Sequence, residues 1–228
     1  MSIRDNYIRL QNEIAELAVS RKRNPGDVRI IAVSKTFSAA AVQEAIDAGM
    51  RVFGENKVQE AKRKIPELVG EFSFHLVGHL QSNKARDAVG LFDLIHSIDS
   101  FGTAERVDAE AGRRGKRQKI LIQVNTSGEN SKSGVAPERA ADLAGRVILL
   151  KNLELLGLMA IAPFTDEEEP VRKSFRAARE TLDTINGVLK LDLRELSMGM
   201  SSDFRIAIEE GSTMVRIGTA LFGQRNAQ

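Results

Sequence analysis

The sequence predicts a single α/β domain folded as a (β/α)8 TIM barrel, and three observations lead to that prediction. First, residues 28–36 read V-R-I-I-A-V-S-K-T, an apolar and β-branched run typical of a strand buried in a parallel sheet. Second, strand-like runs alternate with helical segments along the chain. Third, the 228 residues, 42% of them hydrophobic, suffice for one minimal barrel. A doubly wound open sheet shares this alternation and remains the alternative.

The first half of the chain is expected to contain an extra helix and four strand–helix pairs. Apolar residues recur at helical spacing over residues 4–20, which predicts an amphipathic N-terminal helix, and Asn24-Pro25-Gly26-Asp27 breaks it. Ser38 is expected to cap a helix that ends before Gly49. The other expected elements are strands at 51–56, 72–78 and 94–99 and helices at 58–68, 81–91 and 100–114.

The second half continues the alternation. We expect strands at 119–125, 155–161, 194–200 and 214–221, with helices that open at Pro137, run from about 166 to 187, and end at Gly211. Few residues follow the last strand, too few for a full eighth helix. We therefore predict that the N-terminal helix helps to cover that gap.

Composition narrows the classes of function. Lys and Arg total 33 against 31 for Asp and Glu, so the chain lacks the basic excess of a nucleic-acid-binding protein. The basic run at 113–117 is interpreted as a solvated loop before a strand. There is no cysteine, no apolar run that could span a membrane, and no apolar signal core at the N-terminus. We expect a soluble cytoplasmic protein.

Residues suited to binding phosphate follow the last two predicted strands, where barrels often hold phosphate. The first loop, S-M-G-M-S-S-D-F at 197–204, offers the hydroxyls of Ser201 and Ser202 where a helix is expected to begin. The second, V-R-I-G-T-A-L-F-G at 215–223, offers Gly218 and Thr219. Singly, each residue could serve only as a cap or in tight packing. Together, they predict a phosphate site.

Other sites have less support in the sequence. There is no G-x-x-x-x-G-K-[ST] motif and no G-x-G-x-x-G motif after a strand, which disfavours a nucleotide site. His75, His79 and His96 lack metal-ligand spacing, so no metal site is expected. His75 is interpreted as a satisfied core histidine, and His79 is given no role. Lys35 lies at the carboxyl end of the first strand, the end at which parallel folds place ligands.

Seven segments form an ordered series along nearly the whole chain. They read A-V-S-K-T (32–36), F-G-E-N-K-V-Q-E (53–60), F-H-L-V-G-H-L-Q-S-N-K (74–84), Q-V-N-T-S-G-E-N-S-K-S-G (123–134), G-L-M-A-I-A-P (157–163) and the two loops above. This series resembles the pyridoxal phosphate homeostasis protein family, also called the proline synthetase co-transcribed homologue family, whose barrel is of the alanine-racemase-like type. Phe74 and Ala160 depart from residues common in the family.

The resemblance implies a site for pyridoxal 5′-phosphate (PLP). It implies that Lys35 binds the cofactor as a Schiff base, and that Ser201, Ser202, Gly218 and Thr219 hold its phosphate. It aligns Arg216 with an arginine that faces the pyridine nitrogen, where a cation keeps that nitrogen unprotonated and damps carbanion chemistry. A rim salt bridge is the alternative for Arg216. Asn56 is expected near the ring hydroxyl, and Met159 under the ring or in the core.

The resemblance favours a carrier over an enzyme. Alanine racemases take a second base, a tyrosine, from a partner subunit, and a separate β domain completes their site; this chain has one tyrosine, Tyr7, and no such domain. We therefore expect a PLP-binding protein that takes part in vitamin B6 and amino-acid or keto-acid balance, with no catalytic residues. The alternatives are a weakly active fold-type III racemase or decarboxylase, a barrel that binds another phosphorylated metabolite, and a cofactor-sensing module.

The expected partners are PLP and PLP-dependent apo-enzymes, without nucleic acid or membrane. A monomer is favoured because no long apolar surface stripe is left over. A second, non-covalent cofactor site could be lined by Asn83-Lys84 and Ser131-Lys132.

Overall fold

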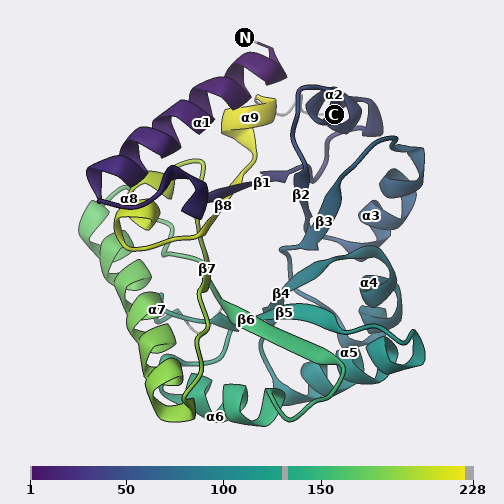
Figure 1. Cartoon of the computed structure of the whole chain (residues 1–228), viewed down its shortest axis with the longest axis vertical. Helices are drawn as coiled ribbons and strands as arrows, with labels where there is room; N and C mark the ends of the chain where they lie inside the picture. Colours follow the sequence, from purple (N-terminus) through teal and green to yellow (C-terminus); the bar gives the residue numbers. More distant parts are fainter. Residues whose placement is uncertain (1, 130–132, 224–228) are drawn as a thin grey trace.

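The computed structural model describes residues 2–129 and 133–223, and it contains a closed barrel of parallel strands in the order β1 to β8 (Figure 1). The (β/α)8 prediction is confirmed, and the open-sheet alternative is wrong because β1 pairs with β8. The strands are β1 (Arg29–Val33), β2 (Val52–Glu55), β3 (Ser73–Leu76), β4 (Leu94–Ile98), β5 (Gln118–Val124), β6 (Leu153–Ala160), β7 (Glu195–Met200) and β8 (Met214–Ile217).

Helices surround the barrel and follow the strands in turn (Figure 1). The α-helices are α1 (Ile3–Ser20), α2 (Ala39–Asp47), α3 (Val58–Lys64), α4 (Ala85–Leu91), α5 (Phe101–Arg113), α6 (Pro137–Val147), α7 (Glu168–Leu189), α8 (Phe204–Glu209) and α9 (Thr219–Phe222). Short 3-10 turns are η1 (Pro25–Asp27), η2 (Ile65–Glu67) and η3 (Ser82–Lys84). Ser38 accepts a hydrogen bond from the Ala41 amide and caps α2 as predicted, and Gly49 has the positive φ, 101°, expected after a helix.

Apolar side chains form two layers, one inside the barrel and one between the strands and the helices. The inner layer is small and includes Ile31, Leu121 and Met214. The outer layer is much larger and holds fully buried aromatic rings such as Phe53 and Phe74, which stack with centroids 5.5 Å apart. This division leaves room inside the barrel for polar side chains.

The N-terminal helix α1 lies beside α8 and α9, outside the neighbouring strands β8 and β1 (Figure 1). Leu10, Ile14 and Ala18 form its buried face. The side-chain amide of Asn6 donates to the carbonyl of Leu221 in α9 at 3.0 Å, and Glu13 pairs with Arg205 in α8. The prediction that this helix covers the gap left after the last strand is confirmed.

Several predicted boundaries are wrong at the carboxyl ends of the strands. The last strand stops at Ile217 rather than at 221, because residues 219–222 turn into α9. The first strand stops at Val33, so Lys35 lies in the following turn. Likewise Asn56 follows β2. Ser201 and Ser202 lie in the turn that leads directly into α8, where a helix was expected to begin. The alternation of side chains along a strand does not mark the residue at which the chain leaves the sheet.

The basic segment before β5, residues 113–117, makes hydrogen bonds within the protein and is not only a solvated loop. The ammonium group of Lys116 donates to the carbonyls of Val89 and Phe92 at the end of α4, at 2.7 and 3.1 Å. Arg117 donates to the carbonyl of Leu153. The two bonds from Lys116 satisfy carbonyls at the end of α4 that the helix itself leaves unpaired. Among the described residues, no helix combines the length and the apolar character needed to cross a membrane.

Candidate functional site

Lys35 and the proposed phosphate-binding residues belong to the same rim of the barrel. β1 and β8 are parallel neighbours, with Ala32 opposite Ile217, so the turn that carries Lys35 emerges beside Gly218. A side chain built on Gly218 would lie 3.4 Å from the carbonyl oxygen of Val33. Lys35 is half-buried there. Residues about 180 positions apart in sequence are therefore brought together by closure of the barrel.

Backbone N–H groups converge on this rim at Ser201. The Ser201 hydroxyl oxygen accepts hydrogen bonds from the amides of Gly218, at 3.3 Å, and Ala220, at 3.4 Å. Ser202 and Thr219 are exposed beside it. Amide donors that converge on one oxygen suit a phosphate oxygen equally well, so the donor set fits a phosphate ester.

The two glycines of these loops have different roles. A Cβ on Gly218 would make only ordinary contacts, so the packing of the protein does not require a glycine there and its bare backbone leaves space at the rim. Gly199, by contrast, has φ = 94°, and a Cβ there would lie 2.5 Å from the Cβ of Ala207. The missing side chain of Gly199 therefore lets α8 pack closely against β7.

Arg216 is buried within the barrel, not at a rim salt bridge. Its Nη1 donates to the carbonyl and the hydroxyl of Ser197, at 2.6 and 2.8 Å, and its Nη2 donates to the carbonyl of Ala160 at 2.9 Å. Burial lowers the pKa of Arg216 to about 10, against a smaller opposing effect of Asp203, so the guanidinium remains cationic at neutral pH. These acceptors are neutral, so Arg216 presents a buried positive charge near the carboxyl ends of β6 to β8.

Two histidines extend this polar chain. Nδ1 of His96 lies 2.9 Å from the hydroxyl of Ser197, and its Nε2 lies 3.0 Å from Nδ1 of His75. Burial lowers the pKa of His75 to about 3 and that of His96 well below its usual value, so both rings are neutral. The interpretation of His75 as a satisfied core histidine is confirmed. The sequence analysis did not assign Ser197 or His96 to this chain of polar groups. The period-two spacing of Leu94 and His96 does place these two side chains on the same face of β4.

Asn56 and Met159 belong to other strands than Lys35: Asn56 directly follows β2, and Met159 lies within β6. Asn56 lines a pocket of about 260 Å³ together with Gln123, Asn125 and the exposed His79. His79 has its Nδ1 3.4 Å from a carboxylate oxygen of Asp99. Met159 is buried in the inner apolar layer with Val33 and Val77, which puts it below the mouth.

The remaining candidates lie elsewhere. Tyr7 lines a pocket with Pro25 and Arg29, where β1 begins, at the opposite end of the barrel from Lys35. Asn83 and Lys84 are in η3 and do not line the pocket at the mouth. The other proposed lining of a second cofactor site, Ser131-Lys132, is outside the described residues.

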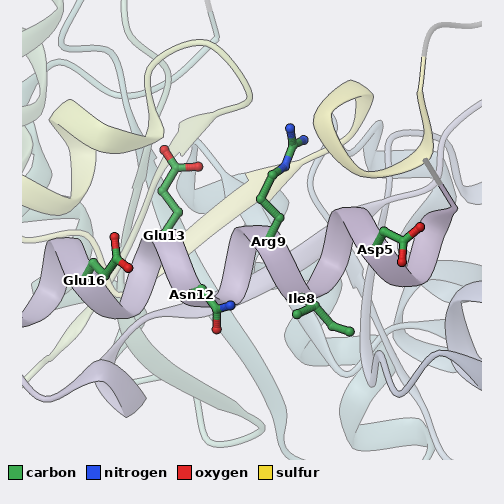
Figure 2. A pocket seen from close by; sticks show the side chains of 6 residues that line it. All are labelled: Asp5, Ile8, Arg9, Asn12, Glu13 and Glu16. Atoms are coloured by element: carbon green, nitrogen blue, oxygen red, sulfur yellow. The ribbon is translucent and has the colours of Figure 1, made fainter.

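A shallow surface groove on α1 is not a candidate site. Figure 2 shows the six side chains that line it, all from this one helix: Asp5, Ile8, Arg9, Asn12, Glu13 and Glu16. The groove has no lining residue from a second element, and its Glu13 is already paired with Arg205 of α8. Within the described part of the chain, no cluster of three His, Cys, Asp or Glu residues is placed to bind a metal ion.

The fold and the rim define a barrel of the alanine racemase N-terminal-domain class, and the profile described as "Alanine racemase, N-terminal domain" matches residues 8–226. The pyridoxal phosphate homeostasis protein of Pseudomonas aeruginosa is 45% identical, over 99% of this chain and 96% of its own. That of Aquifex aeolicus is 38% identical, over 99% of both chains. The chain therefore belongs to the pyridoxal phosphate homeostasis protein family.

A solved structure agrees with this assignment. PipY from Synechococcus elongatus with PLP bound is 43% identical in sequence and has a TM-score of 0.82. The similarity covers 92% of this chain and all of that one.

Proposed function

We propose that this protein binds PLP at the rim where β1 and β8 end and takes part in cellular PLP homeostasis. The observation that carries the proposal is the adjacency of the Lys35 turn to the amide donors at Ser201, on strands that are direct neighbours. The PLP-bound relative and the names of the homeostasis proteins in the family support it.

We assign roles to eight residues. Ser201, Ser202, Gly218 and Thr219 hold the phosphate through hydroxyl and amide donors. When bound, PLP supplies an electrophilic aldehyde and an electron-withdrawing ring. Lys35 would supply the primary amine that binds the aldehyde carbon as a Schiff base, with water as the leaving group. Arg216 would lie toward the pyridine nitrogen, Asn56 near the ring hydroxyl, and Met159 below the ring.

The same arrangement favours storage and delivery over catalysis. The single tyrosine of the chain lies at the opposite end of the barrel and cannot serve as a second base for its own site. A buried cation at Arg216 disfavours protonation of the pyridine nitrogen and so weakens the ring as an electron sink. We propose a cytoplasmic, monomeric protein whose residues 1–228 form one PLP-binding domain and which passes PLP to apo-enzymes.

The first prediction tests the covalent site. Purified protein is incubated with PLP, reduced with borohydride and digested, and the modified peptide is identified by mass spectrometry. We expect the label on Lys35 and a visible absorbance band that Lys35→Ala lacks, while Lys35→Ala still binds PLP non-covalently through the phosphate. Lys62→Ala, which removes an exposed lysine of α3, is the control. A colourless wild-type protein, or rapid Lys35-dependent exchange of amino-acid α-protons, would contradict the carrier.

A further inference from the structure

The turn that carries Lys35 has a strained backbone. The amide of Phe37 donates to the carbonyl of Ser34 at 3.1 Å, which closes a four-residue turn with Lys35 and Thr36 in the middle. Thr36 has φ = 69°, in the left-handed region. A β-branched residue rarely adopts this conformation, and it persists only where the surroundings hold it.

Two side chains of α3 hold this turn from outside the barrel. The amide of Thr36 donates to the carboxylate of Glu60 at 2.5 Å. The ammonium group of Lys64 donates to the carbonyl of Ser34 at 2.8 Å and to the carboxylates of Glu55 and Glu60, at 2.6 and 3.0 Å. These three bonds use all three protons of the ammonium group. The residues on either side of Lys35 are thus each bonded to α3.

The cluster around Lys64 is buried, although a barrel does not need charge there. The side chain of Lys64 is 6% exposed and that of Glu55 is fully buried. Burial raises the pKa of Glu55, against the hydrogen bonds from Lys64 and from the hydroxyl of Ser34, which lies 2.7 Å away. Apolar residues at such positions are often equally stabilising. Stability alone therefore does not explain why these charges are buried. Their bonds to the strained turn explain it better, because they hold the turn in position.

The opposite side of the turn contacts the helix at the phosphate site. The ring of Phe37 stacks on that of Phe222 in α9, with centroids 4.8 Å apart. The turn is therefore held between α3 and α9. This contact sets the spacing between the backbone of Lys35 and the amide donors of Gly218 and Ala220.

We infer that Glu60 and Lys64 are positioning residues that hold the Ser34–Phe37 turn in the strained conformation from which the Lys35 amine reaches its partner. The inference rests on the proposed function for the identity of that partner. It concerns the backbone of the turn, however, and can be measured without any cofactor.

The test compares Glu60→Ala, which removes the acceptor of the Thr36 amide, with Glu60→Gln, which retains an acceptor oxygen. Amide hydrogen exchange of residues 34–37 is measured in the protein without PLP, and the rate of borohydride-trappable bonding to Lys35 is measured with PLP. For Glu60→Ala we expect exchange at Thr36 to rise and the bonding rate to fall, each about tenfold or more. Glu60→Gln should restore most of both. Lys62→Ala, on the exposed face of the same helix, should match wild type.

A second variant, Thr36→Gly, tests the inference at the turn itself. Glycine adopts positive φ without strain, so Thr36→Gly needs less support from Glu60. We expect Glu60→Ala to slow bonding much less in the Thr36→Gly background than alone. Additive effects, or a Glu60→Ala protein that matches Lys62→Ala in both measurements, would overturn the inference. If wild-type protein forms no bond with PLP, the proposed function fails, and the exchange data alone decide the inference.

Discussion

The polar side chains inside the barrel form a directed chain of hydrogen bonds. Arg216 can only donate, so the hydroxyl of Ser197 accepts from it and turns its own proton to Nδ1 of His96. Nε2 of His96 then carries the proton and donates to Nδ1 of His75. This fixes neutral tautomers for both rings and locks the orientation of the guanidinium. The chain thus sets the position of the buried charge that we place beside the pyridine ring.

Neutral buried histidines predict a loss of stability in acid. The pKa of His75 is about 3 in the folded protein, against 6.5 for an unperturbed histidine, so the unfolded chain binds the extra proton below pH 6.5. Stability from this residue is therefore present above 6.5 and is lost as the pH falls toward about 3. Between pH 7 and pH 5 it should contribute a loss of about 2 kcal/mol.

Urea unfolding at the two pH values measures this loss. His75→Gln keeps a neutral hydrogen-bonding side chain but cannot titrate, so its stability should fall by about 2 kcal/mol less than that of wild type. Equal losses in the two proteins would mean that His75 is not the group that takes up the proton.

Among single residues, the sequence identified candidates that lie in recognisable motifs. It did not identify residues whose role depends only on their place in the fold. Ser201 and Gly218 lie in loops whose composition and place after the last two strands predict a phosphate site, and the family resemblance implies the role of Lys35. Ser197, Glu60 and Lys64 look like ordinary strand and helix residues, because their roles come from neighbours across the barrel. Only the closed structure brings Lys64 to the carbonyl of Ser34.

The short helix α9 is the element whose structure differs most from the sequence prediction. Its residues continue an apolar pattern that predicts strand to Leu221, yet they turn at Gly218 and expose amide groups to the rim. A strand of the predicted length would have paired those amides within the sheet. The proposed PLP-binding rim therefore depends on the early end of β8, which is a tertiary effect that local periodicity does not encode.

The stacking between the Lys35 turn and α9 predicts an energetic coupling. Phe37→Leu, Phe222→Leu and the double variant form a cycle in which each single change removes the ring pair but keeps an apolar side chain. We expect a coupling of about 1 kcal/mol in the free energy of unfolding, as for other aromatic pairs. Strict additivity would show that the two elements are independent. The same cycle with Phe53 and Phe74, stacked in the outer layer, is a positive control.

For the whole molecule, α1 acts as the missing outer helix. The sequence predicted this because the chain has too few residues after the last strand, a matter of length rather than of pattern. Most of the barrel could be anticipated in the same way, since eight buried strands in a chain of this size leave few closed alternatives. The ends of the strands could not be anticipated from the sequence, because the caps and turns there are set by contacts with neighbouring elements.

The two faces of α1 should differ sharply in their sensitivity to truncation. Leu10 is 2% exposed, and Leu10→Ala should destabilise the protein by about 2–5 kcal/mol through lost burial and a cavity. Ile8, 49% exposed on the groove of Figure 2, is the matched control, and Ile8→Ala should change stability by less than about 0.5 kcal/mol. Urea unfolding of both variants measures the difference. Similar values for the two would contradict the docking of this face on α8 and α9.

The docking of α1 also has a consequence for biosynthesis. α1 leaves the ribosome long before α8 and α9, against which it packs. Until they emerge, the apolar face of α1 lacks its partners on these two helices, and β1 lacks its neighbour β8. Closure must therefore wait until β8, α8 and α9 have been translated, and during that interval the nascent polypeptide is a natural client for chaperones.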